Sequence, residues 1–188
     1  MMLSSSGVRA SCARYLSRQA PLRCMAMATP SVPTLNLANC VDKAHEGKAL
    51  REIIKLTPGA LQGLKEGAAD DMLGALNVKT IEALGTWKHY RLAKAILVLA
   101  DTEVAGKRLE GSGANINSGV DKAFENYSFQ ELLDAPPSAL QGLAQWSDTT
   151  LAQLRIKTIK DLAQWKFARW AEALTIAAEF ENPEGGSR

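Results

Sequence analysis

The sequence contains few of the residues from which catalytic and metal sites are built. Its 188 residues include two histidines, His45 and His89, and three cysteines. No group of His, Cys, Asp and Glu has the spacing of a zinc site, and no fingerprint of a nucleotide-binding loop or serine hydrolase occurs. These absences predict a protein that is not an enzyme, that has no catalytic residue and no metal site, and that requires no cofactor.

Long apolar runs and paired cysteines are also missing. The longest apolar run, from Leu92 to Ala100, is interrupted by Lys94, whereas a membrane span needs about 18 apolar residues. We therefore predict no transmembrane span. Cys12 and Cys24 lie in or beside a basic leader, so Cys40 remains as a single thiol, which favours a reducing compartment over a disulfide framework.

Acidic residues are absent before Asp42, and the same stretch is rich in serine and holds four arginines, Arg9, Arg14, Arg18 and Arg23. A basic leader of this kind without a long apolar segment is typical of an organelle transit peptide. We assign residues 1–27 to a plastid transit peptide because Arg23-Cys24-Met25-Ala26 resembles a stromal processing site. A mitochondrial leader is the alternative. Loss of the four arginines would change the formal net charge from +2 to −2.

The rest of the chain carries one helical pattern twice, over 49–103 and 128–181. Ala60-Leu61-Gln62-Gly63-Leu64, for example, recurs as Ala139-Leu140-Gln141-Gly142-Leu143. Each copy is predicted to hold about four short helices and a longer final one. No segment alternates as a strand would. The predicted fold class is all-α, with two tandem helical repeats of helix-hairpin-helix-like character, each ending in a longer helix.

Local signals predict where helices begin and end. Ser128-x-x-Glu131 is a capping box that opens a helix over Phe129–Asp134, which Pro136-Pro137 ends. Thr80 and Thr158 are each predicted to cap a one-turn helix, and Asp70 and Asp148 to cap the helix before it. The final helices are expected from about Trp87 to Asp101 and from about Trp165 to Glu181.

Three further segments are assigned as connectors. Residues 28–48, which include two prolines, are predicted to form an arm and lead-in, with an arm that crosses a partner surface as the alternative. Residues 104–127, rich in Gly and Asn, are predicted to be a flexible linker, and 182–188 a frayed tail.

The segments Leu76–Leu84 and Leu154–Leu162 share an order of Leu, Lys, Thr and Ile that resembles helix-hairpin-helix domains. Such domains hold DNA phosphates on a Gly-x-Gly turn, where only glycine lets the backbone approach. The matching stretches here, Gly63–Gly67 and Gly142–Trp146, lack that turn. We therefore predict no nucleic-acid partner and keep a nucleic-acid-binding module of an organelle nucleoid as the alternative.

The four tryptophans fall into two classes. Trp87 and Trp165 hold equivalent positions and are predicted to be structural anchors, together with Thr80 and Thr158. Trp146 and Trp170 occur in the second copy alone. They indicate either asymmetric packing of the two halves or a partner contact, because tryptophan is enriched at interface anchors.

Basic side chains recur at the start of each final helix. The i, i+3 spacing of Lys88 with Arg91, and of Lys166 with Arg169, places each pair on one helical face. This face is either solvated and paired with nearby acids, or a basic strip that meets an acidic protein surface or anionic lipid. Phe167 stands where the first copy has His89, which excludes a shared catalytic base.

The segment Leu84 to Glu103, with Trp87-Lys88, Tyr90-Arg91 and Ala93-Lys94-Ala95-Ile96, resembles a family from algae with red-lineage plastids. Its likeness is to the small extrinsic linker subunit of cryptophyte photosystem–antenna supercomplexes. This resemblance implies a plastid adaptor peripheral to the thylakoid membrane, whose partners are a photosystem core, chlorophyll-binding antenna proteins, or both. Contact between a histidine and a chlorophyll magnesium remains an alternative.

Overall fold

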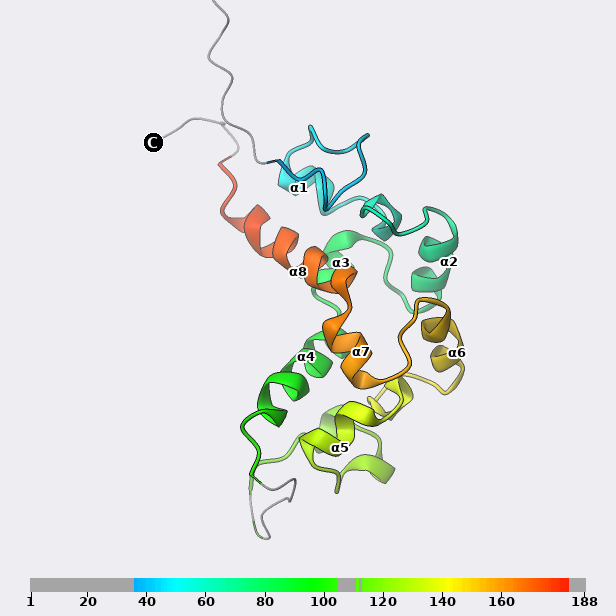
Figure 1. Cartoon of the computed structure of the whole chain (residues 1–188), viewed down its shortest axis with the longest axis vertical. Coiled ribbons are helices and arrows are strands. Elements are labelled where there is room, and N and C mark those ends of the chain that lie inside the picture. The colour runs from blue at the N-terminus through cyan, green and yellow to red at the C-terminus, as the bar shows by residue number, and fades with distance from the viewer. Residues whose placement is uncertain (1–35, 105–110, 112, 183–188) are drawn as a thin grey trace, which may run out of the picture. The chain divides into compact units, whose positions relative to one another are not determined.

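The computed structural model describes residues 36–104, 111 and 113–182 of the chain. The predicted transit peptide, the first part of the predicted arm and the tail after Asn182 lie outside these residues. The described residues form helices and no β-strand (Figure 1), which confirms the predicted all-α fold class. None of the described helices has the length and hydropathy needed to span a membrane.

The first half contains α1 (Leu50–Ile53), the 3-10 helix η1 (Pro58–Ala60), α2 (Ala68–Ala75), α3 (Ile81–Gly85) and α4 (Lys88–Ala100). The second half contains η2 (Asn117–Gly119), η3 (Lys122–Phe124), α5 (Phe129–Asp134), η4 (Pro137–Ala139), α6 (Trp146–Gln153), α7 (Ile159–Gln164) and α8 (Lys166–Glu179). From α1 and from α5 onward, four short helical elements precede a longer final helix.

Side-chain caps set the helix starts at the predicted places. The Oγ1 of Thr80 accepts a hydrogen bond from Ala83 N at 3.0 Å, and that of Thr158 from Asp161 N at 3.1 Å. Ser128 and Glu131 form the reciprocal capping box of α5. Each cap satisfies backbone N–H groups that have no partner inside the helix.

The predicted capping role is confirmed for Asp70, which bonds to the N-cap of α2, but is wrong for Asp148, which makes no cap hydrogen bond to α6. Asp70 accepts hydrogen bonds from Gly67 N, before α2, and from Gly59 N in η1 at 2.7 Å. Asp148 accepts from Ser138 N in η4 at 2.9 Å. The two carboxylates therefore tie the 3-10 helices to α2 and α6, since the short connections bring those N–H groups within reach.

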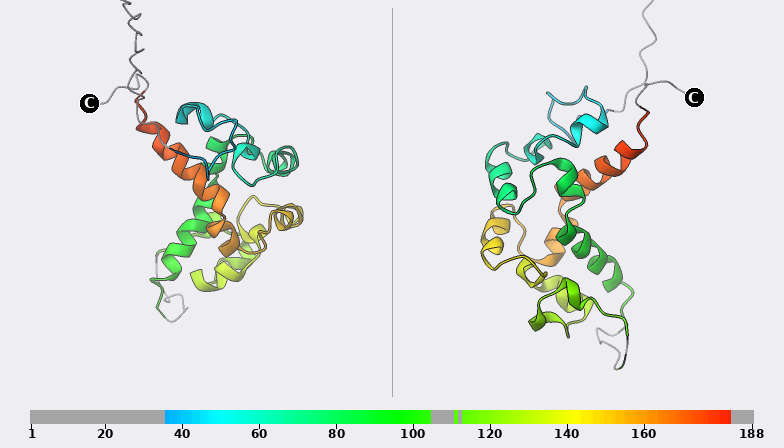
Figure 2. Two further views of the ribbon diagram at one scale, coloured as in Figure 1. Left: turned by 45° about the horizontal axis from the view of Figure 1, so that its top comes forward. Right: turned by 180° about the vertical axis from the view of Figure 1, so that it is seen from behind.

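The final helix of each half packs against the other half. Helix α8 contacts α1 and α3, whereas α4 contacts α5 and α7 (Figures 1 and 2). The Glu181 carboxylate, just beyond α8, accepts hydrogen bonds from Leu50 N at 2.7 Å and Arg51 N at 3.0 Å. The equivalent Glu103, beyond α4, accepts from Gln130 N at 3.2 Å. Each half is thus completed by a helix from the other, and buried side chains from both form one core.

A further recurrence lies before the predicted boundaries at 49 and 128. Val41-Asp42-Lys43-Ala44 recurs as Val120-Asp121-Lys122-Ala123, within segments assigned above to the arm and the linker. Val41 and Val120 are buried and form isolated β-bridges with Leu61 and Leu140. This part of the predicted linker is packed, because each valine fills the core beside the loop that follows η1 or η4.

Candidate binding groove

The start of α8 holds three aromatic side chains and one ammonium group. Trp165 precedes the first turn, and its ring packs edge to face on Phe167, with centroids 5.5 Å apart. Phe167 packs in the same manner on Trp170 at 5.6 Å. The Nζ of Lys166 lies 4.6 Å from the Phe167 centroid and 5.1 Å from that of Trp170, a cation–π arrangement. The rings therefore restrain the lysine at the helix start.

This cluster faces the first half of the chain across a groove of about 590 Å³. We call it the basic groove, and define it by its lining residues, which are Gly63, Leu64, Lys65, Ala68, Ala69, Met72, Gln153, Leu154, Arg155, Trp165, Lys166 and Phe167. The first six come from the turn before α2 and from α2 itself. The others come from the end of α6 and the start of α8. The groove exists because α8 crosses to the other half.

All charged residues that line the basic groove are cationic. They are Lys65, Arg155 and Lys166, each exposed, and no lining residue is acidic. Arg155 adopts a left-handed backbone conformation with φ 63°, and Asn77, at the equivalent position of the first half, has φ 62°. Asparagine adopts this conformation more readily than arginine does. A sterically disfavoured backbone therefore carries one of the three cations.

The equivalent place in the other half is less charged. Lys88 lies near Gly142 as Lys166 lies near Gly63, and both glycines have positive φ. The residues that correspond to Lys65 and Arg155 are the neutral Ala144 and Asn77. The three cations therefore surround the turn at Gly63, whereas the similar turn at Gly142 keeps only the lysine of these three positions.

His89 is the residue of the first half that is equivalent to Phe167 of the basic groove. It is buried, and its Nε2 lies 3.1 Å from the Gln141 carbonyl oxygen. Burial lowers the pKa of His89, the Gln141 hydrogen bond opposes this, and nearby Lys88 lowers it further. A neutral imidazole therefore fills the space beside Gly142.

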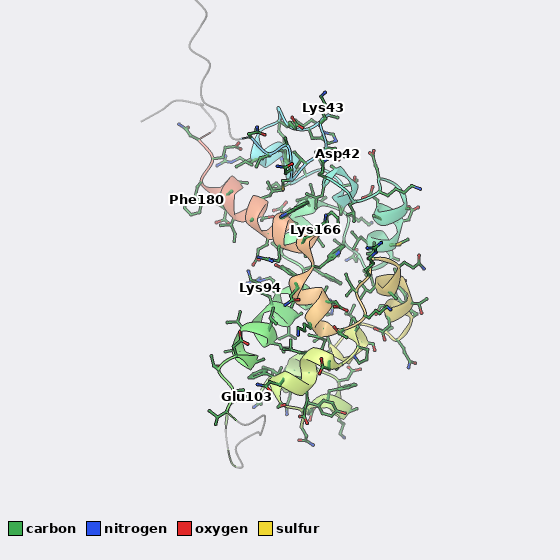
Figure 3. All side chains as sticks on the ribbon, viewed as in Figure 1. Asp42, Lys43, Lys94, Glu103, Lys166 and Phe180 are labelled. Carbon is green, nitrogen blue, oxygen red and sulfur yellow. The ribbon has the colours of Figure 1, made fainter. Side chains whose placement is uncertain are left out.

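The basic residues at the starts of the two final helices have different neighbours. Lys88 and Lys166 lie near glycine turns of opposite halves, whereas Arg91 lies beside Glu172. Glu172 also accepts hydrogen bonds from Lys94 and, at 2.9 Å, from the Tyr90 hydroxyl. Figure 3 labels Lys94 on α4 and Lys166 on α8.

Burial and neighbouring groups shift the pKa values of Glu172 and Tyr90. Burial opposes ionisation of this carboxyl, but hydrogen bonds from Lys94 and Tyr90, with the charges of Lys94 and Arg91, lower its pKa overall. Burial and then Glu172 raise the pKa of Tyr90, which Arg169 partly offsets. Arg91 therefore has the carboxylate of Glu172 as a neighbour, and Arg169 has the phenol of Tyr90.

The tryptophans occupy different environments. Trp87 and Trp165, the predicted anchors, are each 8 % exposed and precede α4 and α8. Trp170 is half-buried against Phe167, so its ring serves packing beside the basic groove. Trp146 begins α6, is 54 % exposed and does not line the groove.

Sequence reasoning missed Lys65, Arg155 and Phe167 as site residues. Comparison of the two copies offers a signal, since each differs in charge or polarity from its counterpart. No protein-family model, curated protein or solved structure matches this chain. Among the described residues, no group of three or more His, Cys, Asp and Glu could hold a metal ion. Function is therefore inferred from the chemistry of the chain's own surface.

Proposed function

We propose that the chain is a non-catalytic adaptor of a plastid, peripheral to the thylakoid membrane. It docks on a photosystem with its chlorophyll-binding antenna and helps to hold antenna proteins together, without a cofactor of its own. The resemblance of Leu84 to Glu103 to linker subunits of red-lineage algae supports this role. The surface of the two final helices supports it independently.

The observation that carries the proposal is a pair of exposed apolar strips at equivalent positions on α4 and α8. The α4 strip consists of Ala95, Val98 and Leu99, and the α8 strip of Ala173, Ile176 and Ala177, continued by Phe180 directly after the helix. Spacings of three and four residues place the members of each strip on one helical face. Val98 is 59 % exposed and Ile176 is 51 % exposed. Exposed apolar side chains that cluster in this way are typical of protein–protein contacts.

The arrangement of the strips suits a molecule that bridges two partners. In Figure 1 the C-terminal ends of α4 and α8 lie at opposite ends of the folded unit. Each strip extends from the pairing of Lys94 with Glu172 toward the C-terminal end of its helix, and the α4 strip lines one shallow pocket with that pair. Two antenna proteins can therefore contact the chain at separate surfaces.

The test is native electrophoresis of mildly solubilised thylakoids that contain tagged variants, followed by mass spectrometry. The unaltered chain should migrate with a photosystem–antenna complex. Val98→Glu and Ile176→Glu should each lower the bound fraction about tenfold, because a charge is placed in an apolar contact. Ala75→Glu, at an exposed position of α2, is the matched control. Absence of the unaltered chain from every photosystem complex would contradict the proposal.

The nucleic-acid alternative has a separate measurement. With a formal charge near −2 after loss of the leader, the chain should bind duplex DNA weakly and release it by ~200 mM salt. Sub-micromolar binding that resists salt would support the nucleoid role instead.

A further inference from the structure

We infer that the basic groove binds a segment of a partner protein in which acidic and apolar side chains alternate. This inference rests on the proposed adaptor role, because it names the chemistry of one docking segment. The cations Lys65, Arg155 and Lys166 surround a surface that is otherwise mainly apolar. Carboxylates pair well with such cations, and apolar side chains gain from contact with the remaining surface.

The apolar part of the groove is suited to side chains of varied shape. Met72 and Leu154 are partly exposed there, on α2 and at the end of α6. Methionine is unbranched and polarizable, so it adapts to different neighbours. The groove also lies between the two halves, where a segment touches α2 on one side and α8 on the other.

The structure favours a peptide over a nucleic acid. Single-stranded nucleic acids bind by stacking bases on exposed aromatic faces. Trp165 and Phe167 are each only 8 % exposed and pack edge to face on one another, which leaves little ring surface for a base. Glu66 and Asp71 are exposed on the segment that carries Lys65, and they would repel a continuous row of phosphates. A short segment with spaced carboxylates avoids both penalties.

The turn near Lys88 provides an internal comparison. It has a similar glycine, Gly142, and a similar lysine, but Ala144 and Asn77 replace two of the three cations. His89 fills the adjacent space and bonds to Gln141. A variant at Lys88 therefore removes the same kind of charge from the same kind of turn without altering the basic groove.

The experiment measures fluorescence anisotropy of a fluorescein-labelled peptide in which glutamate alternates with leucine, bound to the full chain. Arg155→Asn and Lys166→Ala should each weaken binding about tenfold, because each removes one charged partner. Lys88→Ala should leave the affinity unchanged. A peptide with glutamine in place of glutamate should bind far more weakly.

Arg155→Asn is the decisive variant for folding as well as binding. It installs the residue present at Asn77, which is compatible with the left-handed backbone, so melting should be unchanged or slightly higher. Equal weakening by Lys88→Ala would show non-specific attraction, and tighter binding of oligothymidylate than of the peptide would show a nucleic-acid site. Either result overturns the inference.

The inference and the proposed function can fail separately. If the peptide does not bind although the chain migrates with a photosystem complex, the basic groove is not the docking site. If the peptide binds with the expected pattern but the chain migrates with no photosystem complex, the groove assignment stands and the proposed function is wrong.

Discussion

The environment of His89 makes this residue sensitive to pH. Its ring is buried near the start of α4, packed edge to face on Trp87 with centroids 5.3 Å apart. Nε2 lies within hydrogen-bonding distance of the Gln141 carbonyl oxygen, whereas the buried Nδ1 has no hydrogen-bond partner. Protonation would place a charge in this site beside Lys88. The folded state therefore favours the neutral imidazole.

We predict that the free energy of unfolding falls as the pH is lowered below 6.5, the ordinary pKa of histidine. In that range the unfolded chain binds a proton at His89, whereas the folded chain, with its lowered pKa, binds it only at more acidic pH. Protonation thus favours unfolding. His89→Phe, which copies Phe167, should remove this part of the pH dependence in urea unfolding measured between about pH 7 and pH 5.

Titration of carboxyl groups is common to both proteins, so the difference between their two profiles isolates the histidine. Identical loss of stability in the original chain and in the His89→Phe variant would show that His89 is protonated equally in both states.

At the scale of elements, the crossing of α3 and α8 depends on one small residue. A Cβ added to Gly85 would lie 2.6 Å from the carbonyl oxygen of Ala171, closer than van der Waals contact allows. Both partners are backbone or backbone-attached atoms, so neither can move without shifting a helix. The absence of a side chain at Gly85 therefore sets how closely α8 approaches the first half.

We predict that Gly85→Ala lowers the free energy of unfolding by about 1–3 kcal/mol, because the helices must separate to admit the methyl group. Gly74→Ala is the matched control. Gly74 lies within α2, and a Cβ there would meet nothing within 4 Å. That change should stabilise the chain by about 0.5–1 kcal/mol, since alanine loses less backbone entropy than glycine. Thermal melts with equal midpoints for both variants would contradict this account of the crossing.

Local signals were sufficient to predict the helix ends but not the partners of the helices. Thr80, Thr158 and the Ser128 capping box act on residues within one turn, so the sequence reveals them directly. The apolar face of α8 has the same periodicity whether it packs on its own half or on the other. The exchange of α4 and α8 therefore leaves no mark in the hydrophobic pattern.

The residues of the candidate site also divide into those that local sequence signals reveal and those that only the packing of the helices brings together. Lys166 could be predicted because it lies at the start of a helix with a clear spacing, whereas Trp170, predicted with it, lies beside the groove. Lys65 and Arg155 are ordinary exposed basic residues in the sequence, and they become part of a site only when α2, α6 and α8 meet. Their differences from Ala144 and Asn77 were visible but carried no spatial information.

At the scale of the whole molecule, Lys94 and Glu172 hold equivalent positions on α4 and α8 and pair with each other. Two copies of the first half, arranged in the same way, would oppose lysine to lysine. Two copies of the second half would oppose glutamate to glutamate. Like charges at such a contact disfavour the wrong pairing. The two residues therefore favour association of unlike halves.

We predict that a chain broken between Val104 and Gly111 yields two fragments that associate one to one. Each fragment alone lacks the helix that completes its core. Lys94→Glu in the first fragment should weaken association about fivefold, and Glu172→Lys in the second should restore it, a modest effect because the pair is partly exposed to solvent. Sedimentation and circular dichroism of the separate and mixed fragments would test this. A stably helical, monomeric first fragment would contradict it.

The exchange of final helices has a consequence for the time at which the chain becomes folded. Helix α8 covers α1 and α3 but is synthesised after all the other described helices. While the ribosome is still making the second half, α3, whose Ile81 and Leu84 are buried in the folded chain, lacks its packing partner α8. Contacts between such distant segments form slowly, since a long loop must close first. A nascent chain is therefore most vulnerable to aggregation and proteolysis in the interval between completion of α3 and release of α8.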